Sequence, residues 1–164
     1  MLHTKTNPIR VALALAAALA VAGTSTAQAR TQHHYTSVIQ NATLSTANGY
    51  PGLGSTAVLA GTWNSSLFGK GALVDHVKIT GNPTPSTFAI KGTETGFVAG
   101  GSFKSRLTGT STVQPDGSQK IAITGHYVGG TGPYTGAAGS YKFKGSTQPG
   151  GSVVTGRSSG TVSY

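Results

Sequence analysis

Short runs of alternating apolar and polar residues, separated by glycine- and proline-rich turns, make up the chain from Arg30 onward. Successive side chains of a β-strand point to opposite faces, so an alternation with a period of two residues predicts strands with one buried face. Helical spacing of apolar positions is not sustained over a dozen residues, and Gly, Ser and Thr interrupt every candidate helix. The pattern therefore predicts an all-β fold.

Eight strands are expected from these runs, joined by turn-forming segments such as Pro115-Asp116-Gly117. The expected strands are His34–Leu44, Ser55–Trp63, Ala72–Thr80, Thr87–Glu94, Ser102–Val113, Gln119–Val128, Ser140–Thr147 and Val153–Ser163. A meander of this kind closes most economically as an antiparallel barrel, and a two-sheet sandwich is the alternative. We expect an eight-stranded antiparallel β-barrel.

The first 29 residues have the features of an export signal. Lys5 and Arg10 precede an apolar run from Val11 to Ala22, and Ala27-Gln28-Ala29 forms a small-x-small cleavage site. The apolar run is shorter than the roughly 20 residues that a membrane-spanning helix needs. We therefore expect cleavage after this site and a secreted protein with a single domain at residues 30–164.

The chain contains 12 Lys plus Arg, 3 Asp plus Glu and no Cys. The absence of cysteine excludes a disulfide framework, a thiol nucleophile and a thiolate metal site. In the expected strands, the basic side chains share the less apolar face: Lys78, Lys91, Lys104, Arg106, Lys120, Lys142 and Lys144. We expect this outer basic surface to keep the protein soluble, and weak binding to anionic envelope polymers is the alternative. Few aromatic residues lie between these lysines, so we do not expect nucleic-acid binding.

Two acids, Asp75 and Glu94, have the opposite parity and share a face with the apolar residues of their runs. A carboxylate that faces an apolar interior is costly unless it is paired or hydrogen-bonded, and its pKa tends to rise. Such groups often mark functional sites. The alternative is that both acids lie in water at the barrel rims, with a bulge at Gly92 that turns Glu94 outward.

The segment from Val128 to Tyr141 joins two expected strands, and the sequence GGTG follows Val128. An aromatic residue follows after one further residue, Ala after two more, and Gly after one more. This pattern resembles a signature of the dirigent and allene oxide cyclase superfamily. The matching positions are Gly129, Gly130, Thr131, Gly132, Tyr134, Ala137 and Gly139. The resemblance implies an eight-stranded, calycin-like barrel with a cavity for apolar small molecules, in a family that often assembles as trimers. From the residues alone, the segment is a barrel corner whose glycines permit a tight reversal.

The inward acids lead to a specific hypothesis about the site. We expect the catalytic residues to be Asp75, Glu94 and Tyr127. We expect the substrate-binding residues to be Phe88, Phe103, Tyr134 and Tyr141. A neutral carboxylic acid can donate a proton to an epoxide, carbonyl or quinone-methide oxygen, while apolar walls hold the rest of the molecule. The expected function is binding of an apolar small molecule, with isomerisation or cyclisation that needs no cofactor.

A metal site and a filled barrel are the two interpretations that compete with this hypothesis. A metal site is not expected, because His33 and His34 are adjacent and point to opposite faces of a strand. The competing function is a non-catalytic extracellular or envelope interaction protein whose barrel is filled with side chains. A void among the inward side chains would separate a binding protein from a filled barrel.

Overall fold

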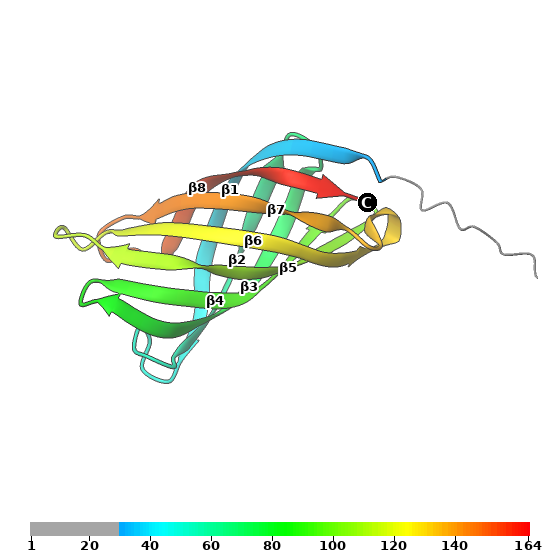
Figure 1. Cartoon of the computed structure of the whole chain (residues 1–164). Coiled ribbons are helices and arrows are strands. Elements are labelled where there is room, and N and C mark those ends of the chain that lie inside the picture. Colours follow the sequence, from blue (N-terminus) through cyan, green and yellow to red (C-terminus); the bar gives the residue numbers. More distant parts are fainter. Residues whose placement is uncertain (1–29) are drawn as a thin grey trace, which may run out of the picture.

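Each of the eight expected runs forms a strand in the computed structural model, which describes residues 30–164. The strands are β1 (Gln32–Ala47), β2 (Thr56–Ser65), β3 (Gly69–Thr84), β4 (Thr87–Val98), β5 (Gly101–Val113), β6 (Gln119–Thr131), β7 (Ala138–Thr147) and β8 (Val153–Ser163). Every neighbouring pair is antiparallel, and β1 also pairs with β8, so the sheet closes into a barrel (Figure 1). The expected barrel is confirmed. The predicted export signal lies outside the described residues.

Most strands extend further than the sequence pattern predicts. The glycines that flank the expected strand Ala72–Thr80 take part in the ladders: Gly71 pairs with Trp63, and Gly81 pairs with Ala89. Within residues 30–164, no helix is long and apolar enough to cross a membrane.

The two-residue period separates the inside of the barrel from the outside, as predicted. Leu73 and Ile79 on β3 are each 1% exposed, whereas Lys78, which has the opposite parity on the same strand, is exposed. All seven basic residues assigned to the outer face are exposed as well. Because moving apolar side chains out of water lowers the free energy, this division of the strands into two faces stabilises the closed sheet.

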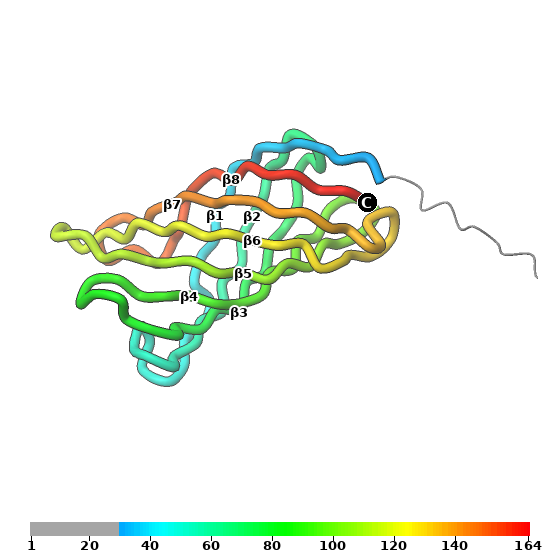
Figure 2. Tube along the Cα trace, in the orientation of Figure 1, coloured from blue at the N-terminus to red at the C-terminus, as the bar shows by residue number. Residues whose placement is uncertain are grey.

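Aromatic side chains fill one end of the barrel, the end that also holds the C-terminus and the short 3-10 helix η1 (Gly132–Tyr134; Figures 1 and 2). We call this set the aromatic plug: Tyr35, Trp63, Phe68, Phe103, Tyr127, Tyr134 and Tyr164. The ring of Phe103 is central, with centroids 4.3 Å from Tyr134 and 4.5 Å from Phe68. The plug closes this end of the barrel.

The glycine-rich segment between β6 and β7 forms a corner beside the plug. Gly132 has φ 60° and Gly139 has φ 139°, both in the region that side chains disfavour. A Cβ added at Gly132 would lie 2.2 Å from the carbonyl oxygen of Gly100, and one at Gly139 would lie 2.2 Å from that of Thr161. The corner therefore requires glycine at both positions, and it folds Tyr134 back over Phe103.

Candidate functional site

The other half of the barrel is not filled. Between the plug and the opposite mouth, the inward side chains leave a cavity of about 290 Å³. Tyr50 and the segment 150–152 lie at its mouth, in the β1–β2 and β7–β8 connections. Its apolar walls are made by Ile39, Leu59, Val77, Ile90, Leu107, Ile121, Ile123, Phe143 and Val154. A mostly apolar void close to the lower end of the roughly 300–1,000 Å³ range suits a small organic ligand.

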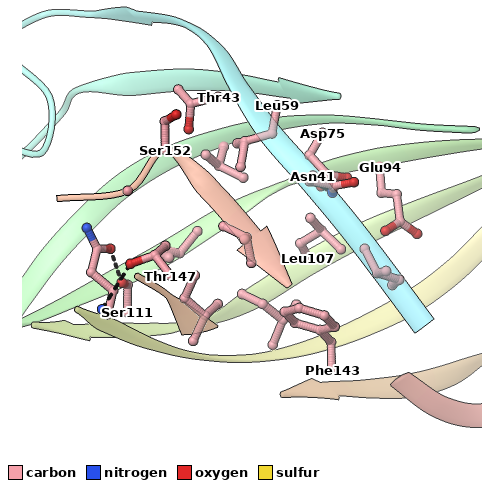
Figure 3. Close-up of a pocket in the computed structure, with 18 of the residues that line it drawn as sticks. Asn41, Thr43, Leu59, Asp75, Glu94, Leu107, Ser111, Phe143, Thr147 and Ser152 are labelled. Carbon is pink, nitrogen blue, oxygen red and sulfur yellow. Dashed lines mark hydrogen bonds between the residues drawn. The ribbon is translucent and has the colours of Figure 1, made fainter. Parts of the chain in front are cut away.

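Asp75 and Glu94 lie in the wall of this cavity. They are directly opposite each other on β3 and β4, and each is 8% exposed. Figure 3 shows both carboxyls grouped with Asn41 on one side of the cavity. Gly92 pairs in regular register with Val77, so there is no bulge at Gly92 and Glu94 stays inward. The alternative that places these acids at a wet rim is therefore wrong.

Each acid accepts one hydrogen bond from a buried side chain. Asn41 on β1 donates its Nδ2–H to Asp75 Oδ2 at 2.7 Å, and Tyr141 on β7 donates its hydroxyl to Glu94 Oε1 at 2.7 Å. The second oxygen of Asp75, Oδ1, is buried and has no hydrogen-bond partner among residues 30–164. An unpartnered oxygen in an apolar wall favours the neutral, protonated acid.

Burial changes the acidity of both carboxyls. Desolvation, followed by the nearby charge of Glu94, raises the pKa of Asp75 to about 8, and the hydrogen bond from Asn41 opposes this shift. Desolvation also raises the pKa of Glu94 to about 7, against the hydrogen bond from Tyr141. Because neither acid is readily ionised, the pair keeps a proton at neutral pH and can donate it to a ligand.

Two glycines make room for the side chains that bind the acids. A Cβ added at Gly125 on β6 would lie 2.1 Å from Cζ of Tyr141, and one at Gly61 on β2 would lie 2.4 Å from Oδ1 of Asn41. Because glycine has no side chain at these positions on β2 and β6, the amide of Asn41 can reach Asp75 and the phenol of Tyr141 can reach Glu94.

The structure brings only part of the predicted site together. Asp75, Glu94 and Tyr141 line the cavity, but the other four predicted residues do not: Phe88, Phe103, Tyr127 and Tyr134. Parity correctly indicates the inner face for Phe103 and Tyr127, yet both lie at the closed end, in the plug. Tyr134 packs in the same plug, and Phe88 is half-buried near the β3–β4 hairpin. The height of a residue along the barrel axis follows from the register of all the strands, which parity does not supply.

Tyr127 lies behind the acids rather than in the cavity. Its hydroxyl hydrogen-bonds that of Tyr35, and its ring packs 5.4 Å from that of Tyr141. A separate void of about 10 Å³ is lined by Tyr127, Tyr141 and Glu94 among others. Tyr127 therefore supports the ring of Tyr141 and does not reach the main cavity.

Asn41 is the site residue that the sequence analysis missed. It is 5% exposed and lies two residues after Ile39, on the same inner face of β1. Parity alone does not select it, because its face of the β1 run, with Tyr35 and Ile39, is no more apolar than the opposite face. Nearer the mouth of the cavity, the hydroxyl of Ser111 donates a hydrogen bond to Oε1 of Gln119 at 2.7 Å (Figure 3). Both residues line the cavity.

The side chains of residues 30–164 offer a proton-donating site and no cluster of three His, Cys, Asp or Glu that could hold a metal ion. Comparison with known proteins gives no relative from which the chemistry could be transferred. No family model, no curated protein and no solved structure matches this chain.

Proposed function

We propose that this protein binds a small apolar molecule that carries one oxygen function, with that oxygen placed at the Asp75–Glu94 pair. One observation supports this most directly: an apolar cavity of about 290 Å³ has two opposed, buried acids in its wall. A filled barrel, the competing interpretation, would leave no such space.

The same geometry is suited to isomerisation or cyclisation. The protonated acid of the pair donates its proton to an epoxide, carbonyl or quinone-methide oxygen, which weakens the carbon–oxygen bond or polarises the double bond. The acid that has become a carboxylate then takes a proton from a carbon or hydroxyl of the same molecule. One proton is given and one is returned, so the composition of the ligand does not change and no cofactor is consumed.

The resemblance of the segment 128–141 to the dirigent and allene oxide cyclase superfamily supports the same proposal, because those proteins use a barrel cavity for apolar molecules. We also propose, from the first 29 residues, that the protein is secreted. Membership of the family, secretion and a trimeric assembly are separate proposals that the binding experiment does not depend on.

A thermal-shift screen tests the binding. Purified protein is heated with lipophilic ketones, epoxides and phenols, and a ligand selective for the folded state raises Tm by mass action. The matched variants are Leu107→Trp, which fills the cavity, and Leu53→Trp, which adds the same ring at a loop position that is 68% exposed. We expect a shift in the wild type and in Leu53→Trp, and none in Leu107→Trp. If no compound shifts Tm, or if Leu107→Trp binds as well as the wild type, the cavity is not the binding site.

A second experiment separates binding from chemistry. Any compound that binds is incubated with the wild type and with the double variant Asp75→Asn/Glu94→Gln, and isomeric products are sought by chromatography. We expect the double variant to bind the compound and form no product. Equal product formation by both proteins would remove the acids from the reaction.

A further inference from the structure

The outer wall formed by β7, β8, β1 and β2, which lie side by side (Figure 1), contains a groove of about 1,040 Å³. The strand register explains its shape. One row of outward side chains crosses the wall in the order Lys144, Arg157, Val38, Asn64. A second row crosses in the order Lys142, Ser159, Thr36, and Ser66 continues it through hydrogen bonds to the backbone of Thr36. Two residues along each strand separate the rows, which is about 6.6–6.8 Å.

The floor between these two rows is open because the side chains of the residues between them point into the barrel. Ser158, Ser37 and Ser65 form the middle row, and all three are buried. Ser37 and Ser158 hydrogen-bond each other through their hydroxyls at 2.6 Å. The floor of the groove is therefore strand backbone, and its two sides are the outward rows. We call this feature the cross-strand groove.

The cross-strand groove is positively charged, and none of the described residues that line it is acidic. Lys144 and Arg157 are directly opposite each other across β7 and β8, and Lys142 lies on the same face of β7. Like charges placed directly opposite destabilise a sheet unless something neutralises them. Of the three acids in the chain, Asp75 and Glu94 are inside the barrel, and Asp116 accepts a hydrogen bond from the backbone N–H of Ser118 at the β5–β6 turn. The neutralising charge must therefore come from another molecule or from salt.

The side chains of the groove also indicate what kind of anion fits. Hydroxyl and amide groups of Thr36, Asn64, Ser66 and Ser159 lie alongside the cations and can hydrogen-bond sugar hydroxyls. Within the part of the chain that the structure describes, no aromatic side chain lines the groove, which disfavours the stacking that single-stranded nucleic acids use. Among residues 30–164, Val38 is the one apolar side chain that lines the groove, so these residues present no apolar face there to insert into a bilayer. A row that crosses four strands at about 4.8 Å spacing suits an extended chain.

From this arrangement we infer that the cross-strand groove binds an acidic polysaccharide, with its carboxylates at Lys142, Lys144 and Arg157 and its hydroxyls along the polar side chains of β1 and β2. The surface would hold the barrel on a carboxylated glycan while the cavity mouth stays open. The inference does not depend on the proposed function, because the groove and the cavity lie on opposite sides of the sheet.

Polygalacturonate is the probe that tests it, with neutral dextran as the negative control. Binding to the purified protein is measured by calorimetry at low ionic strength, where charge contacts are least screened. We expect Lys144→Gln/Arg157→Gln to weaken binding about tenfold or more, since each cation near an anionic surface contributes substantially to affinity. The matched control is Lys78→Gln/Lys91→Gln, which removes another directly opposed, exposed pair on β3 and β4, and we expect it to change binding less than about twofold.

A third variant separates groove binding from general attraction to a basic protein. Ser159→Trp keeps every charge but blocks the groove, and we expect it to weaken polygalacturonate binding as strongly as the double charge variant. Circular dichroism melting shows whether each variant remains folded. Equal losses in the two charge variants, or full binding by Ser159→Trp, would overturn the inference. Tighter binding to single-stranded DNA or to anionic phospholipid vesicles than to polygalacturonate would overturn the choice of ligand.

Discussion

Asp75 and Glu94 occupy directly opposed positions on β3 and β4, and both carboxyls face the interior of the barrel. Two ionised acids in this arrangement would repel each other in an apolar wall. A retained proton removes that repulsion and also supplies the donor that the proposed chemistry needs. The same proton links the stability of the fold to pH.

The first prediction is that the protein loses stability as pH rises. Both acids have folded-state pKa values, about 8 for Asp75 and about 7 for Glu94, above the ordinary pKa values of 3.8 and 4.5. The native state therefore holds more protons than the unfolded state between about pH 4 and pH 8, and the free energy of unfolding falls through this window. Urea denaturation at a series of pH values measures the effect. In Asp75→Asn/Glu94→Gln, we expect most of this pH dependence to disappear.

A second prediction concerns the bond that holds Glu94. Tyr141→Phe removes the hydroxyl that donates to Glu94 at 2.7 Å but keeps the ring. Losing a buried hydrogen bond of this kind costs about 1–3 kcal/mol of unfolding free energy. Because that hydrogen bond lowers the pKa of Glu94, its loss raises this pKa further and shifts the loss of stability to higher pH. An unchanged pH profile in Tyr141→Phe would show that the bond does not control the acid.

The third prediction tests the space that Gly125 provides. A Cβ at Gly125 would lie 2.1 Å from Cζ of Tyr141, so Gly125→Ala must displace the phenol from Glu94. We expect a cost of about 1–3 kcal/mol by chemical denaturation, as for other overpacked sites. Gly81→Ala is the control, because its added Cβ meets only the Cβ of Ala89, at an ordinary 3.7 Å. Equal stability of the two variants would mean that Tyr141 is not held against β6 as described.

A fourth prediction distinguishes the plug from the cavity. Phe103 is 1% exposed at the centre of the plug, and Phe103→Ala should cost about 3–5 kcal/mol. Phe88 is half-buried away from the cavity wall, and we expect Phe88→Ala to leave ligand affinity unchanged. Denaturation and ligand titration on the same proteins test both statements. A loss of ligand affinity in Phe88→Ala without a loss of stability would return Phe88 to the binding site.

The sequence pattern predicts the inside and the outside of this barrel well, because side-chain direction along a strand depends only on local backbone geometry. It therefore places Asp75, Glu94 and Tyr141 inside, and Lys78 and Lys144 outside. The turn residues and the absence of helical spacing are local too, and they give the number and order of the strands.

Other properties of the site depend on contacts between distant parts of the chain. Phe103 and Tyr127 share the inner face with the acids but lie in the plug, because the tilt and register of eight paired strands set their height. The bond between Asn41 and Asp75 joins β1 to β3 across the glycine at position 61. The cross-strand groove likewise exists only because β8 closes on β1.

A carboxyl-carbon NMR titration of the ligand-free protein shows whether Asp75 and Glu94 retain a proton between them, with Asp75→Asn and Glu94→Gln used to assign the two signals. We expect both carboxyls to lose their protons well above the ordinary pKa values of 3.8 and 4.5, with the pair still holding a proton at pH 7. Two independent titrations close to pH 4, in protein shown to be folded, would contradict it, since such acids would be ionised and in water rather than paired in the wall of an apolar cavity.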